Sequence, residues 1–355
     1  MVGFPRPEPD AELRALVDAG VLGAVLFARN VGTPEETAGH ISTLKRWAGR
    51  PFLVSVDQEG GRVARFRGGP FTRLPPMRAV GARGDVEVAR AVGRLLAFEL
   101  RGLGIDWDFA PVLDVDTEPT NPVIGDRSFG GEPALVAAMG VALAEGLEAG
   151  GVASCAKHFP GHGDTTQDSH HVLPLLPHGL ERLNTVELVP FAAYARAGLA
   201  SVMTAHVRFP ALGADVAATL SRPAMTELLR TQLGFGGVAV SDDLEMKAIS
   251  DSAQAAVEAV RAGVDVLLVC HHASAQRSIL DALEAAARSG AISRARLEEA
   301  HRRIDVLVAR FARPPEDRVA TLGSAEHHRL RDAVPWAEHE LVRGPDPTAR
   351  PDPAA

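Results

Sequence analysis

Residues 151–159 read GVASCAKHF, an apolar run that ends in two ionisable side chains, Lys157 and His158. Six further apolar runs, each followed by a helical pattern, occupy residues 23–30, 51–59, 104–115, 200–207, 236–244 and 264–272. Runs that are apolar at nearly every position are typical of strands covered on both faces, as in parallel sheets. Because these runs alternate with helices, the sequence predicts a parallel α/β fold with right-handed crossovers.

Polar side chains stand where the apolar runs give way to loops. They are Asn30, Asp57, Asp114, Lys157 with His158, His206, Asp242 and His271. In a (β/α)8 barrel the C-terminal ends of the strands converge on one mouth, where such enzymes place their chemistry. An open doubly wound sheet would gather them at one switch point, and no G-x-G-x-x-G motif follows the first run. We therefore predict a single (β/α)8 TIM-type barrel with its active site at the C-terminal strand ends, although only seven strands are recognised.

Helix boundaries are indicated by capping residues. Thr33, Pro34 and Glu36 form a cap, a first-turn proline and a capping box. Pro133 opens another helical stretch, which two glycines close. Apolar residues at helical spacing predict two more helices, SDSAQAAVEAVRAG at 250–263 and SRARLEEAHRRIDVLVARF at 293–311.

Composition limits the partners and the compartment. The 355 residues are 46% hydrophobic with a formal net charge of −8, and phosphate binding needs a basic face, so nucleic acid is not an expected partner. No apolar run reaches the length of a membrane span, and MVGFPRPEPDAEL at the start lacks the pattern of a secretory signal. Cys155 and Cys270 lie in apolar runs, which is typical of buried free thiols in a reducing compartment. We expect a cytoplasmic protein that makes no membrane contact.

No internal repeat or linker marks a second domain, so residues 1–342 are expected to form one barrel domain. Residues 343–355, RGPDPTARPDPAA, are rich in proline and polar residues, which is typical of a disordered tail. The sequence does not define the oligomeric state, and a monomer is expected.

Three segments beyond strand ends carry charged groups. VSVDQEGGRVARF at 54–66 contains Asp57 and Arg65, and carboxylate and guanidinium groups at a barrel mouth can hold sugar hydroxyls. The alternative is a structural ion pair. NPVIGDRSFG at 121–130 adds Arg127, whose alternative is a solvated loop arginine. VAVSDDLEM at 238–246 offers Asp242 and Asp243, but neighbours on a strand face opposite ways, so they do not form a carboxylate pair.

KHFPGHGDTTQDSHHVLP at 157–174 is the segment richest in chemistry. A metal site would use its histidines, but Pro160 and Gly161 interrupt the spacing between His158 and His162, and no H-E-x-x-H motif is present. A polar loop without chemistry is a second alternative. The acid–base interpretation uses Asp168 and His170, because a carboxylate two residues away can orient the imidazole and raise its basicity. We expect no metal and no cofactor.

The chain resembles the β-N-acetylhexosaminidases of glycoside hydrolase family 3, of the bacterial single-domain type that acts in peptidoglycan recycling. The matching segments follow the family's order and spacing between about residue 20 and residue 310. They are VDQEGGRVARF, NPVIGDRSF, KHFPGHGDTTQDSH, MTAHVRFP and SDDLEM. KHFPGHGDT followed by DSH is the most specific segment, since the β-glucosidases of the same family lack that loop.

The resemblance implies a role for individual residues. Asp242 would be the nucleophile, and Asp168 with His170 would be the acid–base pair. Contacts to N-acetylglucosamine would come from Asp57, Arg65, Arg127, Lys157 and His158, with His206 lining the pocket. Glu59 and Arg62 would support the first loop.

The resemblance also implies double displacement with retention, on a terminal β-linked N-acetylglucosamine such as that of anhydro-muropeptides. Two alternatives remain open at this point: a phosphorylase that passes the sugar to phosphate, and a β-glucosidase-type relative. A non-catalytic sugar-binding relative is disfavoured, because it should have lost Asp242 or the acid–base pair, and all three residues are present. A metal-dependent hydrolase on the same barrel is disfavoured, because FARN stands where such barrels carry His-x-His.

Overall fold

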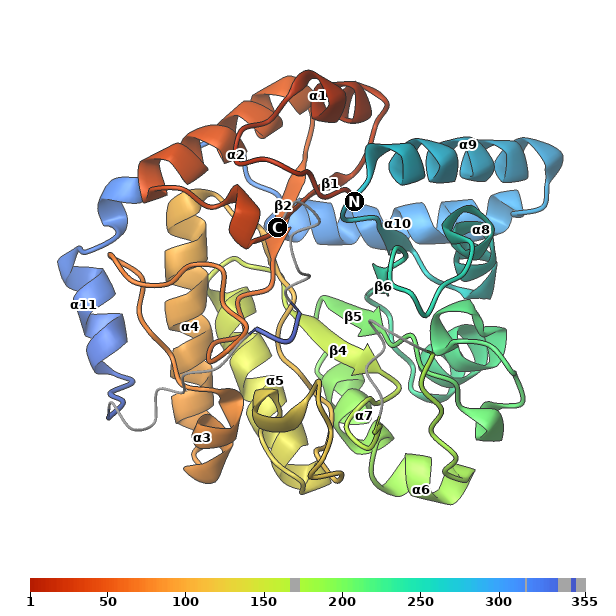
Figure 1. The fold of residues 1–355 in the computed structure, drawn as a ribbon. Helices are drawn as coiled ribbons and strands as arrows, with labels where there is room; N and C mark the ends of the chain where they lie inside the picture. The colour runs from red at the N-terminus through yellow and green to blue at the C-terminus, as the bar shows by residue number, and fades with distance from the viewer. Residues whose placement is uncertain (167–172, 317, 338–345, 349–355) are drawn as a thin grey trace.

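The computed structural model describes residues 1–166, 173–316, 318–337 and 346–348. Seven of its strands are central and run parallel to their neighbours, with helices arranged around them (Figure 1). The strands are β1 (Gly23–Leu26), β2 (Leu53–Val56), β3 (Trp107–Asp108), β4 (Cys155–Phe159), β5 (Ser201–Thr204), β6 (Val238–Asp243) and β7 (Val266–Leu268). They pair in chain order as β1-β2-β3 and β4-β5-β6-β7. Each lies within one of the seven runs that the sequence predicted.

The eighth strand position is taken by the first residues of the chain. Val2 forms parallel bridges to Ala24 of β1 and to Val269, just after β7. Two other parallel bridges join β3 to β4, Trp107 to Ala153 and Val112 to Lys157. The two sheets are thereby linked into one ring of eight strand positions, which confirms the predicted (β/α)8 barrel. The N-terminal position was missed because its pairing spans so few residues.

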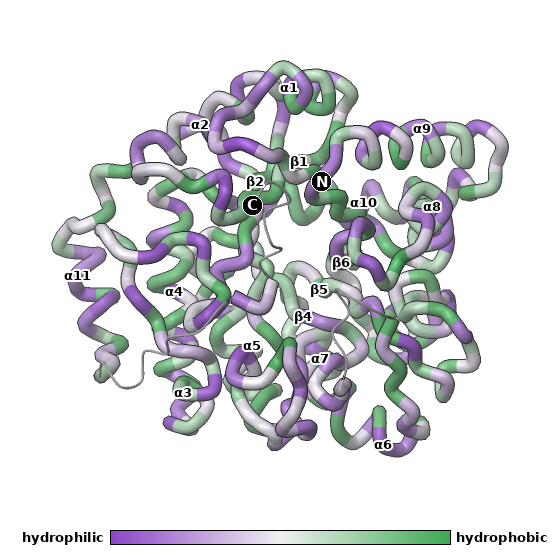
Figure 2. Tube along the Cα trace, viewed as in Figure 1, coloured by the Kyte–Doolittle hydropathy of each residue, from purple (hydrophilic) through white to green (hydrophobic). Residues whose placement is uncertain are grey.

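A helix follows almost every strand and covers the outside of the ring. The helices are α1 (Ala11–Asp18), α2 (Pro34–Ala48), α3 (Met77–Ala82), α4 (Val86–Leu103), α5 (Pro133–Ala149), α6 (Leu180–Thr185), α7 (Leu188–Arg196), α8 (Ser252–Ala262), α9 (Ala273–Ser289), α10 (Arg294–Phe311) and α11 (Ala325–Asp332). A further helical segment, η5 (Pro223–Gln232), lies between β5 and β6. Along the helices purple and green alternate in Figure 2, as expected for amphipathic elements.

The predicted caps form as expected. Thr33 Oγ1 accepts a hydrogen bond from Glu36 N at 3.2 Å, and Glu36 Oε2 accepts one from Thr33 N at 2.9 Å. Pro133 begins α5, and the two helices predicted from spacing correspond to α8 and α10. The run at 104–115 is a strand only at Trp107–Asp108. Pro111 lies within this run and has no N–H to donate to a ladder, which shortens the strand.

Alternating side chains divide the buried residues into two layers. Val25 and Leu53 belong to a cluster inside the ring, whereas Ala24 and Val54 belong to the cluster between strands and helices. This alternation follows from the two-residue period of a strand. Cys155 and Cys270 are buried and free, as predicted, and burial raises the pKa of both thiols. Among the described residues, no helix combines the length and the apolar character needed to cross a membrane.

Candidate active site

Six of the seven predicted site residues that the structure describes line one hollow at the C-terminal ends of the strands. Asp57 follows β2, Lys157 and His158 end β4, and Asp242 lies near the end of β6. Arg65, Arg127 and several apolar side chains complete the lining. The sequence prediction that strand ends meet at one mouth is therefore confirmed for this set. Asp168 and His170 lie outside the described residues.

A larger hollow of about 450 Å³ lies at the opposite end of the barrel. It is lined by residues that precede β5 and β6, such as Leu199 and Gly237, and by side chains of α10. Volume alone would not select the mouth, since its hollow measures only about 70 Å³ and another hollow of about 520 Å³ lies against α4, α5 and α7. The position of the hollow at the mouth nevertheless identifies it as the candidate active site, because (β/α)8 enzymes place their chemistry at the C-terminal strand ends.

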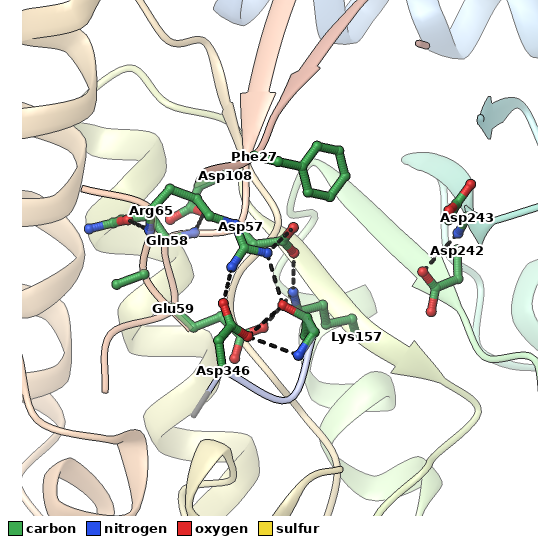
Figure 3. A network of polar contacts seen from close by, with 12 residues as sticks. Phe27, Asp57, Gln58, Glu59, Arg65, Asp108, Lys157, Asp242, Asp243 and Asp346 are labelled. Carbon is green, nitrogen blue, oxygen red and sulfur yellow. Dashed lines mark hydrogen bonds and ion pairs between the residues drawn. The ribbon is translucent and has the colours of Figure 1, made fainter. Parts of the chain in front are cut away.

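Two carboxylates and three cations form a buried network in the mouth. Figure 3 shows four of them, Asp57, Glu59, Arg65 and Lys157. Lys157 Nζ lies 2.7 Å from Asp57 Oδ1 and 2.6 Å from Glu59 Oε1. The guanidinium of Arg127 donates to both oxygens of Glu59, at 2.9 and 2.8 Å. Arg65 Nη2 lies 3.2 Å from Asp57 Oδ2. Lys157 of β4 and Arg127 beyond β3 therefore pair with carboxylates of the segment after β2, whereas Arg65 and Asp57 both belong to that segment.

Pairing sets the ionisation of the two carboxylates. Burial works against their charged forms, but Lys157 with Arg65 outweighs it for Asp57, and Arg127 with Lys157 outweighs it for Glu59. The pKa of both groups is consequently lowered. Asp346 also pairs with Arg65, so the charges of the network are largely balanced, and its donors and acceptors suit hydrogen bonds to sugar hydroxyl and carbonyl oxygens.

Glu59 and Arg62 were interpreted as supports of the first loop, and the structure shows how far that support reaches. Glu59 holds the side chain of Arg127, whereas Arg62 Nε donates to Asp126 Oδ1 at 2.8 Å. Both contacts tie the loop after β2 to the segment that carries Arg127. Gly61 within this loop has φ +54°, and a Cβ there would meet Pro76 Cα at 2.7 Å, so the close backbone approach at this position requires glycine.

We predict that Glu59→Gln lowers the free energy of unfolding by about 3–5 kcal/mol at pH 7, because it leaves buried cations underpaired. A carboxylate whose pKa is lowered on folding contributes fully above its unfolded value, about 4.3, and loses that contribution as pH falls towards the folded value. Urea unfolding at pH 7 and below about pH 4 should therefore show the difference from wild type shrinking with acid. Glu258→Gln, at the exposed surface, is the control. Equal stability of the two variants at pH 7 would contradict the prediction.

His158 is oriented by Asp114, a residue that the sequence marked only as a polar strand end. Its Nδ1 lies 2.7 Å from Asp114 Oδ2, and the same carboxylate accepts hydrogen bonds from the backbone N–H groups of His158 and His162. Burial opposes ionisation of Asp114, but the histidine contacts outweigh it and lower its pKa. Burial lowers the pKa of His162 to about 4, so this imidazole is neutral at pH 7.

His206 differs from the expectation that it lines the pocket. Its side chain is wholly buried, Nδ1 contacts Thr219 Oγ1 at 2.8 Å, and Nε2 lies 3.1 Å from the carbonyl oxygen of Asp243. It is not among the described residues that line the hollow. The position of His206 after β5 predicts the end of the barrel at which it lies. It does not predict whether the ring faces the hollow or packs against residues behind β6.

Asp164, an alternative proton donor in the 157–174 segment, is already engaged. Its Oδ1 accepts from Thr117 Oγ1 at 2.5 Å, and Oδ2 makes a short contact with His178 Nε2. Burial raises its pKa, but these contacts outweigh burial and lower it. Asp164 is therefore ionised at neutral pH and poorly suited to donate a proton.

The lining also includes residues that sequence reasoning did not assign. Phe27 and His271 face each other across β1 and β7, with ring centroids 5.6 Å apart, and Met246 follows β6. His271 was identified in the sequence as a polar residue at the end of an apolar run. For Phe27 and Met246 the sequence does not indicate whether an apolar side chain lines the hollow or belongs to the core. Within the predicted tail, the described residues 346–348 reach Arg65: Asp346 pairs with its guanidinium, and Thr348 Oγ1 accepts from Nη2 at 2.9 Å.

The chain is similar in sequence and in fold to several known proteins. A β-hexosaminidase of Thiobacillus denitrificans is 43% identical over 78% of this chain and 78% of its own length. A glycoside hydrolase family 3 β-N-acetylglucosaminidase from Paenibacillus sp. FPU-7 superposes with TM-score 0.88 at 42% identity. That match covers 94% of this chain and 66% of the Paenibacillus chain, so this chain spans about two thirds of that protein.

NagZ from Neisseria gonorrhoeae, in complex with N-trifluoroacetyl-D-glucosamine, superposes with TM-score 0.78 at 34% identity, covering 94% and 96% of the two chains. The same protein in complex with zinc ion gives TM-score 0.79 at 33% identity, covering 96% and 97%. The model of the glycosyl hydrolase family 3 N-terminal domain matches residues 1–307. The chain therefore belongs to glycosyl hydrolase family 3 and is a glycoside hydrolase.

Proposed function

We propose that the chain is an exo-acting, retaining β-N-acetylglucosaminidase that removes terminal β-linked N-acetylglucosamine. The observation that carries the proposal is the grouping of Asp242 with Asp57, Arg65, Arg127, Lys157 and His158 around one hollow at the barrel mouth. The relatives' names support the sugar: they include a β-hexosaminidase and a β-N-acetylglucosaminidase, and the NagZ structure holds an N-acylated glucosamine. The hydroxyl oxygen of Thr348 accepts a hydrogen bond from Arg65, which is the kind of contact proposed for a hydroxyl group of the sugar.

In the proposed mechanism Asp242 attacks the anomeric carbon while His170 donates a proton to the departing oxygen. Asp168 orients the imidazole. Water, deprotonated by the same imidazole, then displaces Asp242 and releases the sugar with retained configuration. The charged network holds the ring so that the anomeric carbon faces Asp242, which is a contribution of orientation rather than of chemistry.

The aglycone is proposed to be an (anhydro)muropeptide of cell-wall recycling, and the enzyme is proposed to act in the cytoplasm as a monomer. These points rest on the family resemblance. A neutral imidazole in place of a carboxylate would admit anionic aglycones, because it adds no negative charge beside the leaving group.

The function is tested by hydrolysis of a chromogenic β-N-acetylglucosaminide against the corresponding β-glucoside, with and without phosphate. The proposal expects turnover of the N-acetylated substrate, free N-acetylglucosamine as the main product, and little turnover of the glucoside. Preferred cleavage of the glucoside would contradict the sugar assignment. Formation of glycosyl phosphate as the main product would make the protein a phosphorylase.

We further predict that exhaustive chelation leaves the rate unchanged. Within the part of the chain that the structure describes, no three His, Cys, Asp or Glu side chains are grouped as metal ligands. Dialysis against EDTA followed by the chromogenic assay checks this, with added zinc as the second arm. Loss of activity that zinc restores would return the histidines of the 157–174 segment to the metal interpretation, for which the zinc-bound NagZ structure is the natural comparison.

A further inference from the structure

Gln58 is a buried polar side chain beside the substrate-binding residues. It follows Asp57 at the end of β2, and only 3% of it is exposed. Neighbours on an extended segment face opposite ways, so Asp57 lines the hollow while Gln58 faces the loop behind it. A buried amide needs partners for both its oxygen and its nitrogen.

Among the described residues, the hydrogen-bond partners of its side chain are the backbone groups of Arg65 and Phe66, seven and eight positions further along. Gln58 Oε1 accepts hydrogen bonds from Arg65 N at 2.7 Å and from Phe66 N at 3.1 Å, while Nε2 donates to Phe66 O at 3.1 Å. The backbone N–H of Gln58 donates to Asp108 Oδ1 at 2.9 Å, next to β3. The side chain of Gln58 therefore closes the loop after β2, while its backbone N–H ties the start of that loop to Asp108 of β3.

Arg65 is the residue whose placement depends on this closure (Figure 3). Its guanidinium contacts Asp57 and lines the hollow, and its Nε is buried with no partner among the described residues. Because Gln58 holds the Arg65 backbone, it also sets the origin and direction of that side chain.

We propose that Gln58 is a positioning residue for sugar binding, acting through Arg65. This inference rests on the proposed function, in which Arg65 contacts the N-acetylglucosamine ring. At neutral pH a primary amide presents an acceptor and a donor side by side to the backbone of residues 65 and 66. An apolar side chain would leave those groups unpaired, and an ionised carboxylate would face the Phe66 carbonyl with an oxygen.

The first test compares Gln58→Leu with Gln276→Leu. Gln276 is the matched control: it is also a glutamine with 3% exposure, and its Nε2 also donates to backbone carbonyls, those of Gly3 and Val269. We expect Gln58→Leu to raise KM for the N-acetylglucosaminide about 10- to 100-fold, with kcat within about threefold of wild type. Gln276→Leu should lower Tm without changing KM. Equal KM in the two variants would overturn the inference.

The second test uses Gln58→Glu and keeps the inference falsifiable if Gln58→Leu does not fold. A protonated carboxyl reproduces the amide's acceptor and donor, whereas an ionised one does not. The ratio of variant to wild-type KM should therefore fall towards one as pH is lowered from about 8 to about 5, where a buried carboxyl regains its proton. A ratio near one at every pH would overturn the inference.

Failure of the inference and failure of the proposed function are distinguishable. If the wild-type protein cleaved a different glycoside and no N-acetylglucosaminide, the proposed function would be wrong. The KM comparison would then be made on the glycoside that is cleaved, and it would still report whether Gln58 acts on substrate binding.

Discussion

Asp242→Asn is expected to lower kcat by at least about four orders of magnitude while the protein stays folded, as losses at covalent nucleophiles do. Asp242 lines the hollow at the end of β6, and an amide oxygen at this position is too weak a nucleophile to displace an alcohol. Its Oδ1 accepts from Asp243 N at 2.8 Å, a contact that asparagine can keep. Steady-state turnover of the chromogenic substrate, with circular dichroism for the fold, measures the effect.

Asp243→Asn is the matched control. Asp243 is buried, its Oδ1 accepts from Cys270 N and from Glu245 N at 3.1 Å each, and Oδ2 lies 3.1 Å from His271 Nε2. Figure 3 shows the carboxyl groups of Asp242 and Asp243 directed apart. Asparagine keeps an acceptor for the backbone contacts, so substantial activity should remain. A fluorinated sugar that traps the intermediate should label Asp242, and a label on any other residue would overturn the assignment.

His170→Ala is expected to slow substrates with poor leaving groups by about 10²- to 10⁴-fold, the usual range for a general acid, and activated aryl glycosides far less. The reason is that only a poor leaving group needs a proton in the first step. Azide should partly restore turnover, because a small anion can intercept the glycosyl-enzyme without general-base help. The measurement is kcat/KM across a series of aryl leaving groups, with and without azide.

His301→Ala, at an exposed position of α10, is the control for the loss of a histidine. An equal loss on both substrate classes in His170→Ala, with no rescue by azide, would make His170 a structural or binding residue. The acid would then have to be sought elsewhere, and the pairing of Asp164 with Thr117 and His178 makes that carboxylate a poor candidate.

The second step of the proposed reaction, in which an acceptor displaces Asp242, gives a further reason to expect an imidazole rather than a carboxylic acid as the acid–base group. A carboxylate at that position would repel an anionic acceptor by about 1 kcal/mol for unit charges 4 Å apart even in bulk water. A deprotonated imidazole imposes no such penalty, so phosphate should be tolerated and some glycosyl phosphate can form. The phosphate arm of the chromogenic assay measures this directly.

The sequence by itself determined the architecture and the end of the barrel that holds the chemistry. Continuous apolar runs and helix caps act over a few residues, so the strands and the boundaries of α2 and α5 follow from local patterns. A parallel arrangement then brings all strand ends to one mouth. Asp57, Lys157 and Asp242 could therefore be placed together although they are far apart along the chain.

Only the tertiary structure decided how those residues pair. The contacts of Glu59 with both Arg127 and Lys157, the position of His206 behind Asp243, and the closure of a loop by Gln58 depend on ring register and side-chain direction. The two-residue period of a strand predicts the face on which a side chain lies, but it does not predict which side chains of other strands it contacts on that face. The eighth strand position depends in the same way on bridges of Val2 to β1 and Val269, a pairing between opposite ends of the barrel sequence that no local pattern encodes.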